Sequence, residues 1–146
     1  MSDRVILLVE DNASDVALTL RALERGHIAN PVDVVSDGAE ALDYLFARGA
    51  HAARGAAPLP QVLLLDVKLP KIDGIRVLRQ LRADPRTQAL PVVMLTSSDE
   101  YENVRDSYAL GANSYVRKPV EFTAFAEAVQ KLGLYWVLVN RPPGSA

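Results

Sequence analysis

Polar side chains that could do chemistry follow four of the short apolar runs in this sequence. Three are carboxylates, one is a hydroxyl and one is an amine. Any one of them alone could be a turn or a cap, because polar residues commonly end strands. Their recurrence at the same place in successive units makes them one candidate site. The residues are Glu10, Asp11, Asp66, Thr96 and Lys118.

The charges of this set predict a cation. Two carboxylates about 4 Å apart repel by roughly 4 kcal/mol at an effective dielectric constant near 20. Lys118 supplies one positive charge, which leaves an excess of negative charge. A hard divalent ion would balance it, and Mg²⁺ is the natural candidate because it uses one or two carboxylates and bridges to phosphate. The set holds no histidine or cysteine, which argues against zinc.

Alternating apolar and amphipathic segments must position these residues. Ser14 is the predicted cap of a first helix that runs to about Arg25, residues 99–110 form the fourth helix, and Glu121 starts the last. The stretch 48–60, rich in Ala, Gly and Pro, is predicted to be a surface loop. The pattern predicts a parallel sheet covered by helices on both faces, with ligands beyond the carboxyl ends of the strands. The predicted strands are 5–9, 32–35, 62–65, 92–95 and 115–116.

Composition excludes several classes of protein. The chain has 146 residues, which is the size of one domain, and a formal net charge of -2, which argues against a nucleic-acid binder. Its apolar runs are too short to cross a bilayer. It has no cysteine, which excludes disulfides and thiol chemistry. We expect a small cytoplasmic protein that binds neither nucleic acid nor membrane.

The combined spacing of these motifs resembles the receiver domains of bacterial two-component response regulators, over residues 4 to 133. The resemblance implies a doubly wound, flavodoxin-like α/β fold whose five-stranded parallel sheet has the order 2-1-3-4-5. With the length and the apolar pattern of the last helix, we expect a receiver domain over 1–140 with an extended last helix, a tail over 141–146 and no output domain. The matching motifs are Glu10-Asp11, Asp66, Leu69-Pro70, Asp73-Gly74, Thr96-Ser97, Tyr115 and Lys118-Pro119.

The resemblance further implies a role for each carboxylate. Asp66 would be the phosphoryl acceptor, a nucleophile that becomes an acyl phosphate. Glu10 and Asp11 would place Mg²⁺ together with Asp66, and the backbone carbonyl of Lys68 would be a further ligand. For Asp15, the favoured reading is a first-turn acid that suits the helix dipole, and contact with the metal shell is the alternative.

The remaining site residues would neutralise charge and respond to phosphorylation. Lys118 would pair with a phosphoryl oxygen, and its bond to Pro119 would be cis. Thr96 would move its hydroxyl onto another phosphoryl oxygen, and Tyr115 would be the aromatic switch that follows Thr96 inward. A phosphoryl group adds a charge of about -1.5 to -2 and three acceptor oxygens, which makes such a response plausible.

An apolar stripe marks the last helix and continues beyond Gly133. From Leu134 onward a second apolar face adds to it, whereas a helix on one sheet needs only one face. We expect this surplus surface to form a homodimer, and the alternative is that it folds back over its own core. The expected interface residues are Phe122, Leu134, Tyr135, Trp136 and Leu138.

These observations together predict a single-domain response regulator that takes a phosphoryl group from a histidine kinase. It would catalyse its own modification and turn over no separate metabolite. The loop before the third strand and the end of the chain are similar to stand-alone receivers that serve phytochrome-type histidine kinases. Signalling would pass through its own surface, a dimer or a downstream phosphotransfer protein. The alternative is an interaction module of the same fold that acts without phosphorylation; a nucleotide-binding enzyme is disfavoured because no glycine-rich loop follows the first strand.

Overall fold

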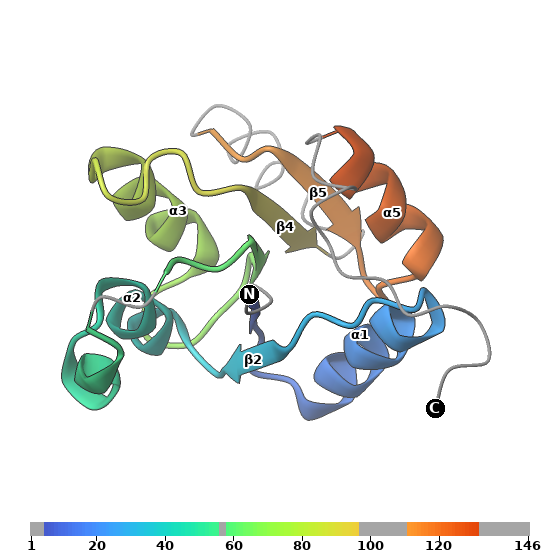
Figure 1. Cartoon of the computed structure of the whole chain (residues 1–146), viewed down its shortest axis with the longest axis horizontal. Helices are drawn as coiled ribbons and strands as arrows, with labels where there is room; N and C mark the ends of the chain where they lie inside the picture. Colours follow the sequence, from blue (N-terminus) through green and yellow to red (C-terminus); the bar gives the residue numbers. More distant parts are fainter. Residues whose placement is uncertain (1–4, 56–57, 97–110, 132–146) are drawn as a thin grey trace.

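The computed structural model describes residues 5–55, 58–96 and 111–131 of the chain (Figure 1). Strands and helices alternate along these residues, as the sequence pattern predicts. The predicted helix over 99–110 and the part of the last helix beyond residue 131 lie outside the described residues. The elements are β1 (Ile6–Val9), α1 (Ala13–Arg25), β2 (Val32–Val35), α2 (Gly38–Phe46), the 3₁₀ helix η1 (Gly49–Arg54), β3 (Val62–Asp66), α3 (Gly74–Ala83), β4 (Val92–Thr96), β5 (Ser114–Arg117) and α5 (Phe122–Lys131).

The five strands form one sheet in the order β2-β1-β3-β4-β5, and every neighbouring pair is parallel. The helices α2 and α3 lie on one side of the sheet, and α1 and α5 lie on the other (Figure 1). This architecture confirms the predicted doubly wound fold and its strand order.

Period-two alternation along the central strands fills two hydrophobic clusters. In β1, Leu7 and Val9 pack with α2 and α3, whereas Ile6 and Leu8 pack with α1 and α5. All four are completely buried, because helices cover both faces of a parallel sheet. Burying an aliphatic side chain contributes about 1.5–3 kcal/mol, so these strands anchor the fold and hold their carboxyl ends in place.

The first helix begins earlier than predicted. Its N-cap is Asn12 and not Ser14, because the Asn12 backbone is extended and its side chain accepts a hydrogen bond from the backbone N–H of Asp15 at 2.9 Å. An N-cap side chain satisfies a backbone donor two or three residues ahead, and Asn12 already does so. Ser14 therefore lies inside the first turn, and Gly26 ends the helix as expected.

The stretch predicted as a surface loop does lie at the surface, but residues 49–54 form the 3₁₀ helix η1, so the loop conformation was wrong there. The Arg54 guanidinium lies 3.9 Å from the centre of the Tyr44 ring and donates to the Tyr44 carbonyl at 3.1 Å. The His51 ring packs edge-on against Tyr44, and its Nε2 lies 3.2 Å from a Glu40 carboxylate oxygen. Contacts with α2 hold this segment in place. Such contacts need no apolar residues at regular spacing, so the sequence shows no periodic apolar pattern here.

None of the helices in the described part of the chain is long and apolar enough to span a membrane.

Candidate functional site

The predicted site residues meet at the carboxyl edge of the sheet. Glu10 follows β1, Asp66 is the last residue of β3, Thr96 is the last residue of β4 and Lys118 follows β5. The parallel register sets Val9 beside Leu65 and Asp66 beside Leu95, so the strands end at nearly the same level. The structure thereby brings together residues that are more than 100 positions apart in the chain.

Three carboxylates surround the ammonium group of Lys118. Its Nζ lies 2.8 Å from Oε1 of Glu10, 3.0 Å from Oδ2 of Asp66 and 3.1 Å from Oδ2 of Asp15. The side chains of Glu10 and Asp66 are only 1% and 4% exposed, whereas that of Asp15 is 30% exposed. The site therefore has a buried centre with one carboxylate at its solvent side.

The backbone also holds Lys118 in place. Its N–H donates to the carbonyl of Thr96 at 2.8 Å, which extends the β4–β5 pairing past the end of the sheet. The peptide bond between Lys118 and Pro119 is cis, as predicted.

The acidic cluster fits a divalent metal ion. Glu10, Asp11 and Asp66 each offer a carboxylate oxygen, and these oxygens lie within 4.8 Å of one another. The buried Oε1 of Glu10 makes an ion pair with Lys118 but no hydrogen bond, so it retains acceptor capacity. A set of oxygen ligands of this kind suits a hard cation such as Mg²⁺. The N–H of Lys68 lies 3.4 Å from Oδ1 of Asp66, which places the Lys68 backbone beside the cluster; its carbonyl as a ligand stays a prediction.

Burial and charge shift the protonation of this site. Burial and, next in size, the neighbouring Glu10 carboxylate raise the pKa of Asp66 to about 7, and the Lys118 ammonium only partly opposes them. Burial alone would lower the pKa of Lys118, but the carboxylates of Glu10, Asp66 and Asp15 outweigh it and raise that pKa. The lysine thus stays charged, while the carboxylates still repel one another and favour an additional cation.

The two predicted switch residues lie on neighbouring strands in different surroundings. Thr96 is buried at the end of β4. Tyr115 lies in β5, paired in register with Met94, and its side chain is on the exposed side of the strand with 45% of its surface accessible. The inward movement of Tyr115 stays a prediction.

Sequence reasoning did not find the role of Asp15. The structure places it in the first turn of α1, as the favoured reading held, but its carboxylate contacts Lys118 and does not belong to the group of metal-ligating oxygens. A signal for this contact was present, because the start of α1 follows β1 after only three residues and so lies at the carboxyl edge of the sheet.

Two glycines let the loop after β3 pack tightly beside the site. A Cβ on Gly74 would lie 2.1 Å from the carbonyl oxygen of Asp66, and a Cβ on Gly38 would lie 1.8 Å from the carbonyl oxygen of Ile72. Lys71 in this loop has a φ of 66° and an ion pair with Asp37 at 3.5 Å. The Asp73-Gly74 motif is therefore explained by close backbone approach.

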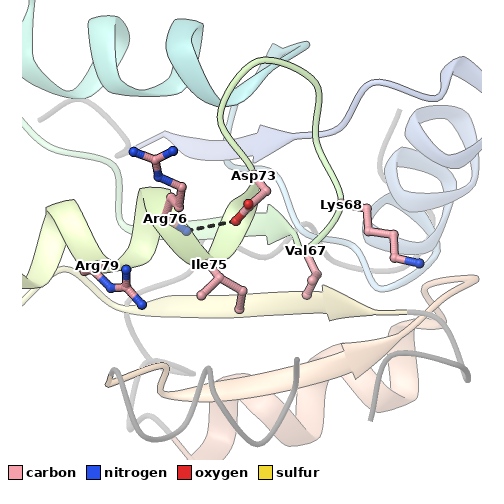
Figure 2. A pocket seen from close by; sticks show the side chains of 6 residues that line it. All are labelled: Val67, Lys68, Asp73, Ile75, Arg76 and Arg79. Atoms are coloured by element: carbon pink, nitrogen blue, oxygen red, sulfur yellow. Dashed lines mark hydrogen bonds between the residues drawn. The ribbon is translucent and has the colours of Figure 1, made fainter. Parts of the chain in front are cut away.

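A shallow hollow of about 370 Å³ lies next to the site, along the start of α3. Asp73 caps this helix by accepting a hydrogen bond from the backbone N–H of Arg76 at 3.0 Å. Figure 2 shows the Lys68 side chain pointing away from those of Arg76 and Arg79, so the basic groups do not converge on one point. The hollow is lined by Val67, Lys68, Asp73, Ile75, Arg76 and Arg79, and the acidic cluster lies outside it.

Of the expected dimer residues, only Phe122 is described. It is partly buried against the cluster formed by α1 and α5, and a Cβ on Gly26 would lie 1.9 Å from its ring. Phe122 thus packs against its own chain in this structure. Leu134, Tyr135, Trp136 and Leu138 lie outside the described residues, so the homodimer stays a prediction.

Comparison with known proteins gives close matches over nearly the whole chain. The probable methanogenesis regulatory protein FilR2 of Methanothrix harundinacea is 41% identical over 142 residues, which cover 97% of this chain and 89% of the relative. The structure of the bacteriophytochrome response regulator AtBRR is 50% identical, with a TM-score of 0.87, and the match covers 97% of this chain and 100% of that one.

Two further solved structures carry a metal or a phosphoryl group. The Mn(2+)-bound form of the response regulator Rcp1 is 33% identical, with a TM-score of 0.74 and coverage of 97% and 99%. The phosphorylated cyanobacterial phytochrome response regulator RcpA is 34% identical, with a TM-score of 0.75 and coverage of 93% and 95%. The model of the response regulator receiver domain family matches residues 6–130. With this match and the acidic site at the sheet edge, the chain belongs to the response regulator receiver domain family.

Proposed function

We propose that this protein accepts a phosphoryl group on Asp66 from a histidine kinase and signals through the change that follows. The observation that carries the proposal is the contact of one ammonium group, Lys118 Nζ, with both Asp66 and Glu10 in a buried site. Phosphoryl transfer depends chiefly on positioning and on neutralising charge on the equatorial oxygens. A fixed lysine beside the strand-end carboxylate of Asp66 supplies both.

The proposed transfer forms one bond and breaks one. A carboxylate oxygen of Asp66 attacks the phosphorus of a phosphohistidine, a P–O bond forms, and the P–N bond breaks. The departing imidazole keeps the electron pair of the broken bond. Lys118 lies on the Oδ2 side of Asp66, where it can meet the negative charge of the incoming group. The protein modifies itself in this step and turns over no separate metabolite.

The residues that would hold Mg²⁺ are Glu10, Asp11, Asp66 and the backbone carbonyl of Lys68. When bound, Mg²⁺ neutralises charge on the phosphoryl oxygens and orients them. Glu10 and Asp66 are buried by the surrounding strands, whereas Asp11 is exposed. The protein side of the site is therefore fixed, and the ion and the donor can enter from the solvent side.

Thr96 and Tyr115 would respond to the new charge. Thr96 is the last residue of β4, which lies beside the strand that ends at Asp66, and we expect its hydroxyl to move onto a phosphoryl oxygen. Tyr115 lies on the neighbouring strand with its side chain on the exposed face, which leaves an inward movement open to it. Such a switch couples local electrostatics to a packing change.

We propose a phytochrome-type histidine kinase as the phosphoryl donor. The similarity to proteins described as phytochrome or bacteriophytochrome response regulators supports this choice. A transfer assay would compare the purified protein with such a kinase under its two light conditions. A matched non-phytochrome kinase is the control, and equal transfer from both would contradict the choice of donor.

The experiment for the phosphoacceptor role uses Mg²⁺ and a small phosphodonor such as phosphoramidate. Intact-mass measurement should show the addition of one phosphoryl group to the wild type and none to Asp66→Asn. An unmodified wild-type protein would favour the alternative, an interaction module that acts without phosphorylation.

A further inference from the structure

Asp15 is a third carboxylate partner of Lys118, and it comes from a different part of the fold than the other two. It lies in the first turn of α1, 103 residues before Lys118, and its Oδ2 accepts a hydrogen bond from Lys118 Nζ at 3.1 Å. Asp15 does not belong to the group of oxygens placed to hold a metal. Its contact with the site therefore passes through Lys118.

The ammonium group is surrounded by carboxylates in this arrangement: it donates hydrogen bonds to Asp66 and Asp15 and makes an ion pair with Glu10. A lysine ammonium carries three N–H donors and accepts nothing. Three carboxylate oxygens, from Glu10, Asp66 and Asp15, lie within 3.1 Å of Lys118 Nζ. A phosphoryl oxygen that approaches Lys118 Nζ therefore competes with these carboxylates for the ammonium group.

Asp15 is the partner that can leave most readily. Asp66 itself carries the phosphoryl group, so the comparison is between Asp15 and Glu10. The Asp15 side chain is 30% exposed, so water can solvate a released carboxylate, whereas Glu10 is almost fully buried and would lose a partner without gaining water. The backbone N–H of Asp15 is anchored by the Asn12 cap at 2.9 Å. The carboxylate can then swing away by side-chain rotation, without unwinding the helix.

We infer that Asp15 is a positioning residue that holds Lys118 in the unmodified protein and that a phosphoryl group on Asp66 displaces it. This inference rests on the proposed function. Asp15 competes with the phosphoryl oxygen for one ammonium donor, so it stabilises the unphosphorylated state. A partly exposed ion pair is worth about 0.2–1 kcal/mol, so removing Asp15 strengthens the binding of a phosphoryl mimic by up to about fivefold.

The test compares the wild type with Asp15→Asn, Asp15→Glu and the control Glu121→Gln. Glu121 is exposed and lies three residues after Lys118, and among the described residues it makes no ion pair with that lysine. The Glu121→Gln substitution removes one negative charge near Lys118, as Asp15→Asn does, but leaves the contact between Asp15 and Lys118 in place. Two measurements are made on each folded protein, whose melting temperature is recorded separately.

The first measurement is the NMR signal of the Lys118 ammonium group in metal-free protein, assigned by its loss in Lys118→Arg. We expect faster proton exchange and a shifted resonance in Asp15→Asn, and wild-type behaviour in Asp15→Glu and Glu121→Gln. The second is the dissociation constant of beryllofluoride, a phosphoryl mimic, at saturating Mg²⁺. We expect about two- to fivefold tighter binding in Asp15→Asn only.

The outcomes separate this inference from the proposed function. A wild type that binds no beryllofluoride would overturn both. Binding by the wild type with an equal dissociation constant in Asp15→Asn, or an unchanged Lys118 resonance in that variant, would overturn only the role of Asp15. Tighter binding in Glu121→Gln of the same size would also overturn it, because net charge would then explain the effect.

Discussion

The Nζ atom of Lys118 lies 3.0 Å from Oδ2 of Asp66, although 52 residues separate them in the chain. This ion pair joins the ends of β3 and β5, which are not neighbours in the sheet, because β4 lies between them. It links the proposed phosphoryl acceptor to a cation held by a separate strand.

Replacing Lys118 by methionine should slow phosphorylation of Asp66 by small donors about 30- to 900-fold. The methionine keeps the length of the side chain but removes the charge that meets the phosphoryl oxygens, and such groups contribute about 2–4 kcal/mol to a transition state. Intact-mass time courses measure the rate. Lys71→Met is the control, since Lys71 pairs with Asp37 at 3.5 Å and not with the site. Equal rates in both variants would contradict the assigned role.

Mg²⁺ binding should weaken as the pH falls from 8 to 6. Burial raises the pKa of Asp66 to about 7, so protons compete with the metal in this range. In metal-free protein the raised pKa of Asp66 makes its contribution to folding stability larger at low pH than at high pH, whereas Mg²⁺ binding is stronger at high pH. The contribution of Asp66 to stability is fully present below its unfolded pKa of about 3.9 and is lost as the pH rises through about 7. The stabilisation by Mg²⁺ is therefore larger at pH 8 than at pH 6.

Calorimetric titration with Mg²⁺ and urea unfolding at several pH values check these signs. Asp66→Asn has no titrating group at this position and should lose most of the pH dependence. A wild-type affinity that stays constant between pH 6 and 8 would contradict the raised pKa of Asp66.

Gly74→Ala should destabilise the protein by about 1–3 kcal/mol and reduce phosphorylation. The added Cβ would lie 2.1 Å from the Asp66 carbonyl oxygen, so the backbone that carries the acceptor must shift. Gly55→Ala is the matched comparison: its Cβ would meet no atom within 4 Å, and only its φ of +48° adds strain. Urea unfolding measures the stability of both variants, and intact-mass time courses measure their phosphorylation. Gly55→Ala should retain phosphorylation. Equal losses in both variants would argue against the close approach of Gly74 to the Asp66 carbonyl.

Arg54→Ala should loosen η1 without changing phosphorylation. The guanidinium stacks on Tyr44 and donates to two backbone carbonyls, of Tyr44 and Pro58, and these contacts together stabilise the segment by about 1–2 kcal/mol. Hydrogen exchange should speed up over residues 48–55. Arg79→Ala, which replaces an exposed residue on α3, provides the control. Unchanged exchange in Arg54→Ala would show that other contacts hold the segment.

The sequence predicted the sheet well because its signals are local and repeated. Apolar runs of strand length alternate with helical patterns, and polar residues follow the runs, so the meeting of Glu10, Asp66 and Lys118 was predictable from topology. The helix cap at Asn12 was missed because Asn12 and Ser14 are both good capping residues, and only the backbone conformation decides between them.

Tertiary side-chain contacts were the part that the pattern could not predict. The 3₁₀ helix depends on Arg54 stacking against Tyr44, and a sequence of Ala, Gly and Pro gives no periodic sign of it. The contact of Asp15 with Lys118 joins residues 103 positions apart, and its geometry depends on how α1 and the end of β5 meet. Neither contact is encoded in local propensity.

The most direct test of the central claim is chemical trapping of the modified residue. The protein is treated with Mg²⁺ and a small phosphodonor, reduced with borohydride, digested and sequenced by mass spectrometry, because reduction converts an aspartyl phosphate to homoserine. We expect homoserine at position 66 in the treated wild type and at no position in Asp66→Asn. Homoserine at another aspartate, or none in the wild type, would contradict Asp66 as the phosphoryl acceptor.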